Sequence, residues 1–167
     1  MKTVLLLLAA ALTLSADGKL SDRRAPGFSL PDMKMEQHDT QDYRGKVLII
    51  DILTTTCPEC QKLTKTLREI STEQGNKIAV LSIVTMPDSM DTVMRFTKDF
   101  FVDWPILFDS GQVIASYLKL SPSNPTVHFP HLFIVDPAGM IRADYDGTEA
   151  KSLTVESLSA EIAKYNK

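Results

Sequence analysis

The sequence predicts an α/β sandwich, with a central mixed sheet that is mostly parallel at its centre and flanked by helices. Short continuous apolar runs, typical of strands buried on both faces, occur at residues 46–53 and 77–84. Segments with apolar residues at helical spacing alternate with them, at residues 59–74 and 90–101. The chain has 167 residues, of which 44% are hydrophobic. This length suits one domain with a substantial core.

The N-terminus has the pattern of an export signal. Lys2 supplies a positive charge, and an uncharged run of about eleven residues follows at 4–14. A spanning helix needs roughly 20 apolar residues, so a permanent membrane segment is less favoured. We therefore predict a signal peptide at residues 1–16 and a mature domain at 17–167. An uncleaved anchor, which would be the chain's link to a membrane, and a buried helix of the domain are the alternatives.

The first half of the domain predicts two strand–helix pairs. Residues 46–53 ("KVLIIDIL") form a buried strand, and the helix at 59–74 ends before a glycine. The second strand, at 77–84, leads through "MPDS" to the second helix, at 90–101. Strands and helices that alternate in this way favour a parallel arrangement.

The second half predicts shorter elements. Three prolines indicate a loop at 121–130, and "PAG" is typical of a tight turn between two strands. The predicted elements here are strands at 105–108, 131–136 and 140–145, and helices at 113–118 and 154–165.

The two cysteines of the chain, Cys57 and Cys60, stand where a buried strand gives way to a helix. Pro58 suits the first helical position, which places Cys57 at the helix start. Free backbone N–H groups and the helix dipole there favour a thiolate. Residues three apart on a helix share a face, and a small shift at the cap permits a disulfide. We predict that an attacking Cys57 and a more buried, resolving Cys60 cycle between dithiol and disulfide, with no other cofactor.

A purely structural disulfide is the less favoured interpretation of this pair. Two cysteines three positions apart close a very short loop, which restrains the unfolded chain little. A domain of this length also does not need such a bond for stability.

Asp51 is the one charged residue in the apolar run "VLIIDIL". A buried carboxylate is costly unless it is paired, functional or neutral. It lies six residues before Cys57, on the strand that leads into the helix, so it can point beneath the cysteine pair. We predict that it exchanges a proton with Cys60. A carboxylate at an exposed strand edge, or one with a structural hydrogen bond, is the alternative.

The stretches "APGFSLPDM" and "DYRGKVLIIDILTTTCPEC" resemble the opening of the thioredoxin-like, TlpA/ResA-type thiol-disulfide oxidoreductases of bacterial envelopes, near the AhpC/TSA peroxiredoxin-like group. The similarity continues through "WPILFD" to "FPHLFIVDPAGMIRADYDG" and covers residues 25–147. It implies a thioredoxin-like sandwich in the periplasm or on the extracytoplasmic side of the membrane. Implied partners are envelope protein thiols or disulfides and an upstream electron donor or acceptor.

The charges are dispersed along the chain and sum to −3. The sequence therefore has no basic patch of the kind that binds nucleic acid.

The resemblance also implies roles for particular residues. Cys57 would be the nucleophile, Cys60 the resolving thiol and Asp51 the buried acid. Pro130 matches the cis-proline that faces the cysteine pair and shapes the substrate groove. Phe129, just before it, would pair its backbone with an extended substrate.

The residues around the cysteines depart from the family pattern. Thr56 stands where tryptophan is usual, and the pair encloses Pro58 and Glu59 rather than Gly-Pro or Glu-Pro. Leu63 occupies the place of a glutamate in ResA-type members. Because Thr56, Pro58 and Glu59 would contact the substrate, partner choice and redox potential stay open, and with them the direction of electron flow.

A peroxiredoxin-like thiol peroxidase is the first alternative. Thr54 precedes Cys57 by three positions, giving T-x-x-C, although Ile50 stands where that site would have proline. Cys57 would form a sulfenic acid that Cys60 resolves. Arg142 is a candidate for the arginine of such a site.

The second alternative is a non-enzymatic metal-binding protein of the same fold. His128 and His131 are also three apart and flank Pro130, so Cys57, Cys60 and the two histidines would make a Cys₂His₂ set. The proline between the histidines points their rings in different directions, which favours ordinary loop and strand histidines.

Overall fold

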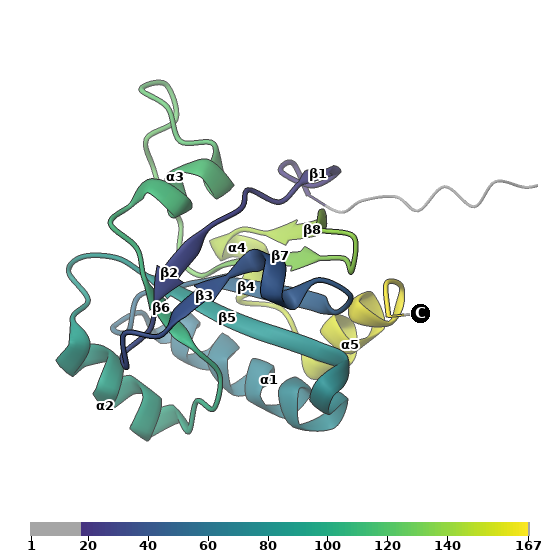
Figure 1. Cartoon of the computed structure of the whole chain (residues 1–167), viewed down its shortest axis with the longest axis horizontal. Coiled ribbons are helices and arrows are strands. Elements are labelled where there is room, and N and C mark those ends of the chain that lie inside the picture. The colour runs from purple at the N-terminus through teal and green to yellow at the C-terminus, as the bar shows by residue number, and fades with distance from the viewer. Residues whose placement is uncertain (1–17, 167) are drawn as a thin grey trace, which may run out of the picture.

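The computed structural model describes residues 18–166, and the signal peptide predicted at 1–16 lies outside them. A six-stranded sheet in the order β1–β8–β7–β4–β5–β6 forms the centre (Figure 1). Neighbouring strands β4, β5 and β6 run parallel, whereas β7 and β8 run antiparallel. The predicted α/β fold with a central mixed sheet is therefore confirmed. The strands are β1 (Arg23–Arg24), β2 (Ser29–Pro31), β3 (Gln37–Asp39), β4 (Val47–Ile52), β5 (Ile78–Val84), β6 (Ile106–Phe108), β7 (His131–Val135) and β8 (Met140–Tyr145).

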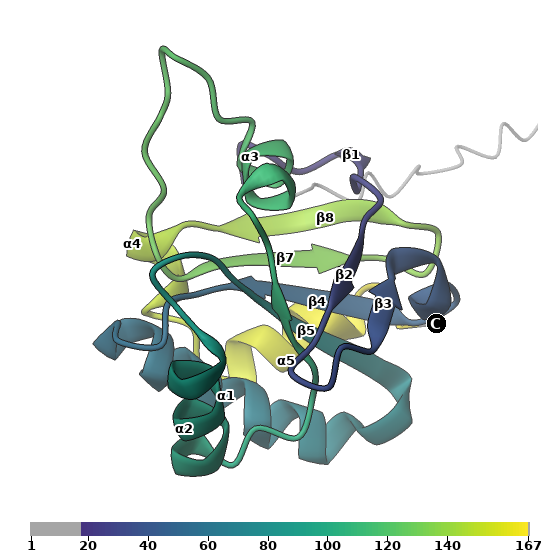
Figure 2. The same ribbon diagram turned by 60° about the vertical axis from the view of Figure 1, so that its left-hand side comes forward.

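Helices cover both faces of the sheet (Figures 1 and 2). Apolar residues of α1, α2 and α5 join one core, and those of α3 and of the segment around Phe28 join the other. The α-helices are α1 (Pro58–Gln74), α2 (Met90–Phe100), α3 (Gln112–Leu118), α4 (Gly147–Ala150) and α5 (Val155–Ala163), with short 3₁₀ helices η1 (Thr40–Tyr43) and η2 (Gly75–Lys77).

Strand β4 is buried at every position because it lies between these two cores. Successive side chains of a strand point to opposite faces. Ile49 and Leu53 therefore pack on the α1 side, whereas Ile50 and Ile52 pack on the α3 side. Asp51 has the phase of Ile49 and Leu53, so it points to the face that carries α1.

The predicted bounds of the long elements agree with the structure to within one or two residues. The sequence prediction missed the β2–β3 hairpin, whose strands of three residues are too short to show a pattern. It also missed α4, a single turn capped by Asp146. Across residues 18–166, no helix has the combined length and apolar character needed to cross a bilayer.

Candidate active site

The cysteine pair lies at the start of α1. Cys57 is the N-cap residue, and its sulfur accepts the backbone N–H of Cys60 at 3.3 Å. Pro58 follows at the first position of the helix, where a missing N–H costs no hydrogen bond. Cys57 is half-buried, Cys60 is buried, and both are free thiols. The helix therefore presents one accessible sulfur with a second one behind it.

The Cys60 thiol is held in its neutral form. Burial raises its pKa well above the usual value, and the neighbouring Cys57 side chain acts in the same direction. Burial disfavours a thiolate because water no longer solvates the charge. A reaction that uses the Cys60 thiolate consequently needs a nearby group to take its proton.

Asp51 is such a group. Its side chain is 0% exposed, on the face of β4 that carries α1. Burial raises its pKa to about 7, and a hydrogen bond from the Ser82 hydroxyl opposes this rise. The second carboxylate oxygen, Oδ1, has no hydrogen-bond partner within residues 18–166. Asp51 thus lies on the face of the sheet that carries Cys60, and its charge helps to raise the pKa of the Cys60 thiol. With a pKa of about 7, the Asp51 carboxyl can change its own protonation near neutral pH.

The loop before Cys57 is fixed by Asp88, which follows the neighbouring strand β5. One carboxylate oxygen of Asp88 accepts the backbone N–H of Thr55 at 3.1 Å, and the other accepts the Thr55 hydroxyl. Thr92 donates to the same carboxylate at 3.0 Å, and Gln61 Nε2 donates to the Thr55 carbonyl at 2.9 Å. Our sequence prediction missed Asp88. Thr55 and Asp88 are 33 positions apart, and the parallel pairing of β4 and β5 brings them to one edge of the sheet.

Phe129 and Pro130 lie at the same edge of the sheet. Their peptide bond is cis, as predicted, and the next two residues, His131 and Leu132, pair with Ile52 and Asp51 of β4. Gly147, the first residue of α4, packs against the Phe129 backbone. A Cβ atom at Gly147 would lie 2.9 Å from the Phe129 carbonyl oxygen. Figure 2 shows α4 at the end of the sheet where β7 begins.

The predicted substrate-binding residues next to the cysteines are accessible. Thr56, Pro58 and Glu59 are exposed, and Glu59 lies in the first turn of α1. Leu63, one turn after Cys60, is buried in the core. The roles of these residues, and those of Cys57, Cys60, Asp51, Phe129 and Pro130, stay predictions.

The histidines beside Pro130 do not meet the cysteines. His131 stacks on Phe133 at 4.6 Å between ring centroids and lies 3.6 Å from Asp144, on the α3 side of the sheet. Cys60 belongs to the opposite core. The strand alternation that places Asp51 toward α1 thus turns His131 away, and among residues 18–166 no four-ligand set forms with the cysteines.

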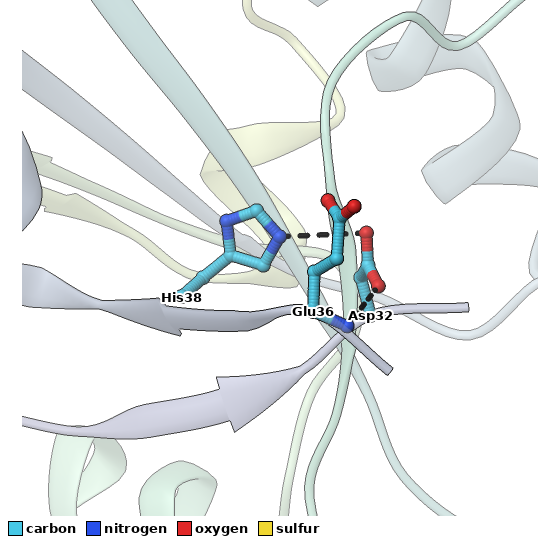
Figure 3. Close-up of side chains that lie close together, drawn as sticks. All are labelled: Asp32, Glu36 and His38. Carbon is cyan, nitrogen blue, oxygen red and sulfur yellow. Dashed lines mark hydrogen bonds and ion pairs between the residues drawn. The ribbon is translucent and has the colours of Figure 1, made fainter. Parts of the chain in front are cut away.

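Within residues 18–166, one group of three potential metal ligands does come together, far from the cysteines in sequence. Asp32, Glu36 and His38 place one ligand atom each within 4.8 Å of one another in the β2–β3 turn (Figure 3). Asp32 accepts the backbone N–H groups of Lys34 and Glu36, at 2.7 and 3.0 Å. His38 contacts the Tyr43 hydroxyl at 2.9 Å. These contacts join the turn to η1.

Arg142 does not serve the cysteine site. Its guanidinium contacts Asp136 at 2.7 Å and Asp22 at 3.4 Å. Asp136 follows β7, at the opposite end of that strand from Pro130. Arg95 of α2 lines a cavity of about 250 Å³ together with Thr55 and Thr56, which precede Cys57.

Comparison with known proteins gives consistent matches. A family model described as the AhpC/TSA family matches residues 22–144. The chain is 27% identical over 131 residues to the thioredoxin-like protein YneN of Bacillus subtilis, covering 77% of this chain and 73% of that protein. It is 24% identical over 127 residues to the thiol-disulfide oxidoreductase ResA of Geobacillus kaustophilus, covering 76% and 70%.

The fold has solved counterparts. A thiol:disulfide interchange protein of the thioredoxin family from Chlorobium tepidum superposes with a TM-score of 0.75 at 15% identity. The match covers 87% of this chain and 97% of that one. These similarities confirm the predicted resemblance to thioredoxin-like, ResA-type proteins.

Proposed function

Because the chain belongs to the AhpC/TSA family, and its relatives include thiol-disulfide oxidoreductases, we propose that it exchanges disulfides with polypeptide partners through Cys57 and Cys60. One observation carries the proposal. A half-buried thiol caps α1, and a buried thiol lies behind it, next to a buried carboxyl whose pKa of about 7 suits proton transfer.

The reaction has two steps. The Cys57 thiolate attacks one sulfur of the partner's disulfide, a bond forms between Cys57 and that sulfur, and the other partner sulfur leaves as a thiolate. Cys60 then attacks the Cys57 sulfur, which forms the Cys57–Cys60 disulfide and releases the second partner thiolate. Two electrons pass from the cysteine pair to the partner. The proton that Cys60 loses goes to Asp51, and the reverse sequence oxidises a partner dithiol.

The partner binds as an extended segment on the surface beside the cysteines. Phe129 offers its backbone next to Pro130, on the edge of the sheet where α1 begins. Exposed Thr56, Pro58 and Glu59 complete the contact surface. Thr56 supplies a small polar side chain, so partners gain little from aromatic stacking.

The protein acts outside the cytoplasm, in the bacterial periplasm or on the outer side of the membrane. This part of the proposal rests on Lys2 and the uncharged run at 4–14. Its partners there are envelope proteins with thiols or disulfides and a donor or acceptor that resets the cysteine pair.

The reduced protein is tested in parallel for reduction of a disulfide-bonded polypeptide and for consumption of hydrogen peroxide. We expect disulfide reduction that disappears in Cys57→Ser. Rapid peroxide consumption that depends on Cys57, without disulfide exchange, would establish the peroxidase alternative instead. Arg95→Ala is a further comparison, because Arg95 shares a cavity with Thr55 and Thr56 in the loop before Cys57. A loss of peroxide consumption without a loss of disulfide exchange would favour the peroxidase alternative.

A further inference from the structure

Asp51 has an unusual environment for a carboxylate that has to ionise. It is 0% exposed, and its one hydrogen bond within residues 18–166 comes from Ser82, whose Oγ lies 3.4 Å from Oδ2. The titratable group facing it is the Cys60 thiol on α1. On the neighbouring strands, uncharged Ser82 and Leu132 stand opposite Asp51. Within the described residues, no lysine, arginine or histidine contributes to its pKa.

Ser82 is itself oriented by Trp104. The indole Nε1 donates to Ser82 Oγ at 2.9 Å, and both residues are buried, at 1% and 9% exposure. An indole N–H can only donate, so the Ser82 oxygen accepts there. The single hydroxyl proton of Ser82 then remains available for Asp51. Three segments from adjacent positions in the sheet thus form the chain Trp104 to Ser82 to Asp51.

We propose that Ser82 and Trp104 are a positioning pair, which holds the Asp51 carboxylate in an ionised form that accepts the proton of Cys60. The inference rests on the proposed function. An ionised carboxylate accepts hydrogen bonds only, and a hydroxyl whose oxygen is occupied by Trp104 points its proton toward that acceptor. No cation contributes to the Asp51 pKa within the described residues. The hydrogen bond from Ser82 is therefore the polar contact that offsets the cost of burying the Asp51 charge.

The test separates the two thiols by their order of reaction. A nitrobenzoate disulfide reagent releases one coloured thiolate when Cys57 attacks and a second when Cys60 resolves the mixed disulfide. The rate of the second release depends on ionised Asp51, with a midpoint near its pKa of about 7.

We expect Ser82→Ala to move this midpoint up by about one pH unit, because the charged form of Asp51 loses its hydrogen-bond donor. Trp104→Phe moves it in the same direction by less. Ser159→Ala, which removes a buried hydroxyl of α5 that has no partner within residues 18–166, leaves it unchanged.

A second readout does not depend on turnover. Trp104 is the sole tryptophan of the chain, so its emission against pH reports the protonation of Asp51 through Ser82. We expect one transition in the wild type, absent in Asp51→Asn, which does not titrate, and absent in Ser82→Ala, which lacks the hydroxyl that joins Trp104 to Asp51. If the midpoint for the second thiolate release is unchanged in both Ser82→Ala and Trp104→Phe, the positioning pair is overturned and the exchange reaction still stands. A wild-type protein without a second release would instead overturn the exchange reaction, while the emission titration still tests the pair. If Ser82→Ala does not fold, Trp104→Phe decides the question alone.

Discussion

At the scale of single residues, the Asp51 carboxyl sets the pH behaviour of both the site and the fold. Its pKa of about 7 in the folded protein lies far above the usual 3.8 because burial removes water from the charged form. Between those two values the folded protein binds a proton that the unfolded chain releases. The contribution of Asp51 to stability therefore falls as the pH rises from about 4 to about 7. Above about pH 7 the folded protein carries the full free-energy cost of a buried, ionised Asp51.

Asp51→Asn removes this penalty while keeping the shape of the side chain. We expect the free energy of unfolding to rise by about 2–4 kcal/mol near pH 8 and to change little near pH 4. Urea unfolding at the two pH values measures the difference. An equal effect at both would show that the charge of Asp51 is not the cause.

Gly147 fixes the position of Phe129 and Pro130. A Cβ atom there would lie 2.9 Å from the Phe129 carbonyl oxygen, closer than non-bonded atoms approach. We expect Gly147→Ala to displace this segment and to lower kcat/KM for a disulfide-bonded polypeptide about ten-fold, while the reaction of Cys57 with a small disulfide changes little. Gly27→Ala is the matched control, because its Cβ would meet only Thr40 at an ordinary 3.7 Å. Equal losses for both disulfides would place the effect on the cysteines rather than on the groove.

At the scale of elements, the start of α1 depends on a loop that belongs to the next strand. Thr55 gives both its backbone N–H and its hydroxyl to Asp88, and Thr92 of α2 donates to the same carboxylate. Thr55 is therefore connected to α2 through the Asp88 carboxylate. The threonine next to Thr56, which departs from the family pattern, thus has a structural partner in Asp88.

Asp88→Ala tests this connection. The Thr55 N–H and hydroxyl lose their acceptor, so we expect a loss of about 1–3 kcal/mol in the free energy of unfolding and faster amide exchange at Thr55 and Thr56. Asp91→Ala is the control, since Asp91 is an exposed acid in the first turn of α2. Slow exchange at Thr55 in Asp88→Ala would mean that the loop is held by other contacts.

The sequence was informative where a signal is local. A helix start is indicated by Pro58 between Cys57 and Cys60. Asp51 is the one charged residue in an apolar strand, so it could be identified from its neighbours alone. Asp88, Ser82 and Gly147 escaped prediction because their partners are separated by 18 to 33 positions, and only the sheet brings them together. The β2–β3 hairpin escaped for another reason, since strands of three residues carry no periodicity.

At the scale of the whole molecule, the site lies where the carboxyl ends of β4 and β5 meet the start of β7. The two cores on either side of the sheet decide which groups can meet. Asp51 and Cys60 share the α1 side, and His131 is directed to the other. The side-chain directions in this sheet therefore favour a thiol pair over a Cys₂His₂ metal centre at the edge where α1 begins.

The proposed export also concerns the whole chain. We expect the protein recovered from cells that make the full sequence to be found in the envelope fraction and to begin near Asp17. N-terminal sequencing or intact mass measures this. A protein that retains Met1 and stays in the cytoplasm would contradict the proposed location, and one that retains Met1 in the membrane would indicate an uncleaved anchor.

In the proposed reaction, Cys57 attacks the partner and Cys60 resolves the mixed disulfide. Intact mass after reaction of the reduced protein with a disulfide-bonded peptide tests this order. We expect a stable peptide adduct on Cys57 in Cys60→Ser, none in Cys57→Ser, and a wild type that becomes lighter by two hydrogens without an adduct. An adduct on Cys60 in Cys57→Ser, or a lasting adduct on the wild type, would contradict it.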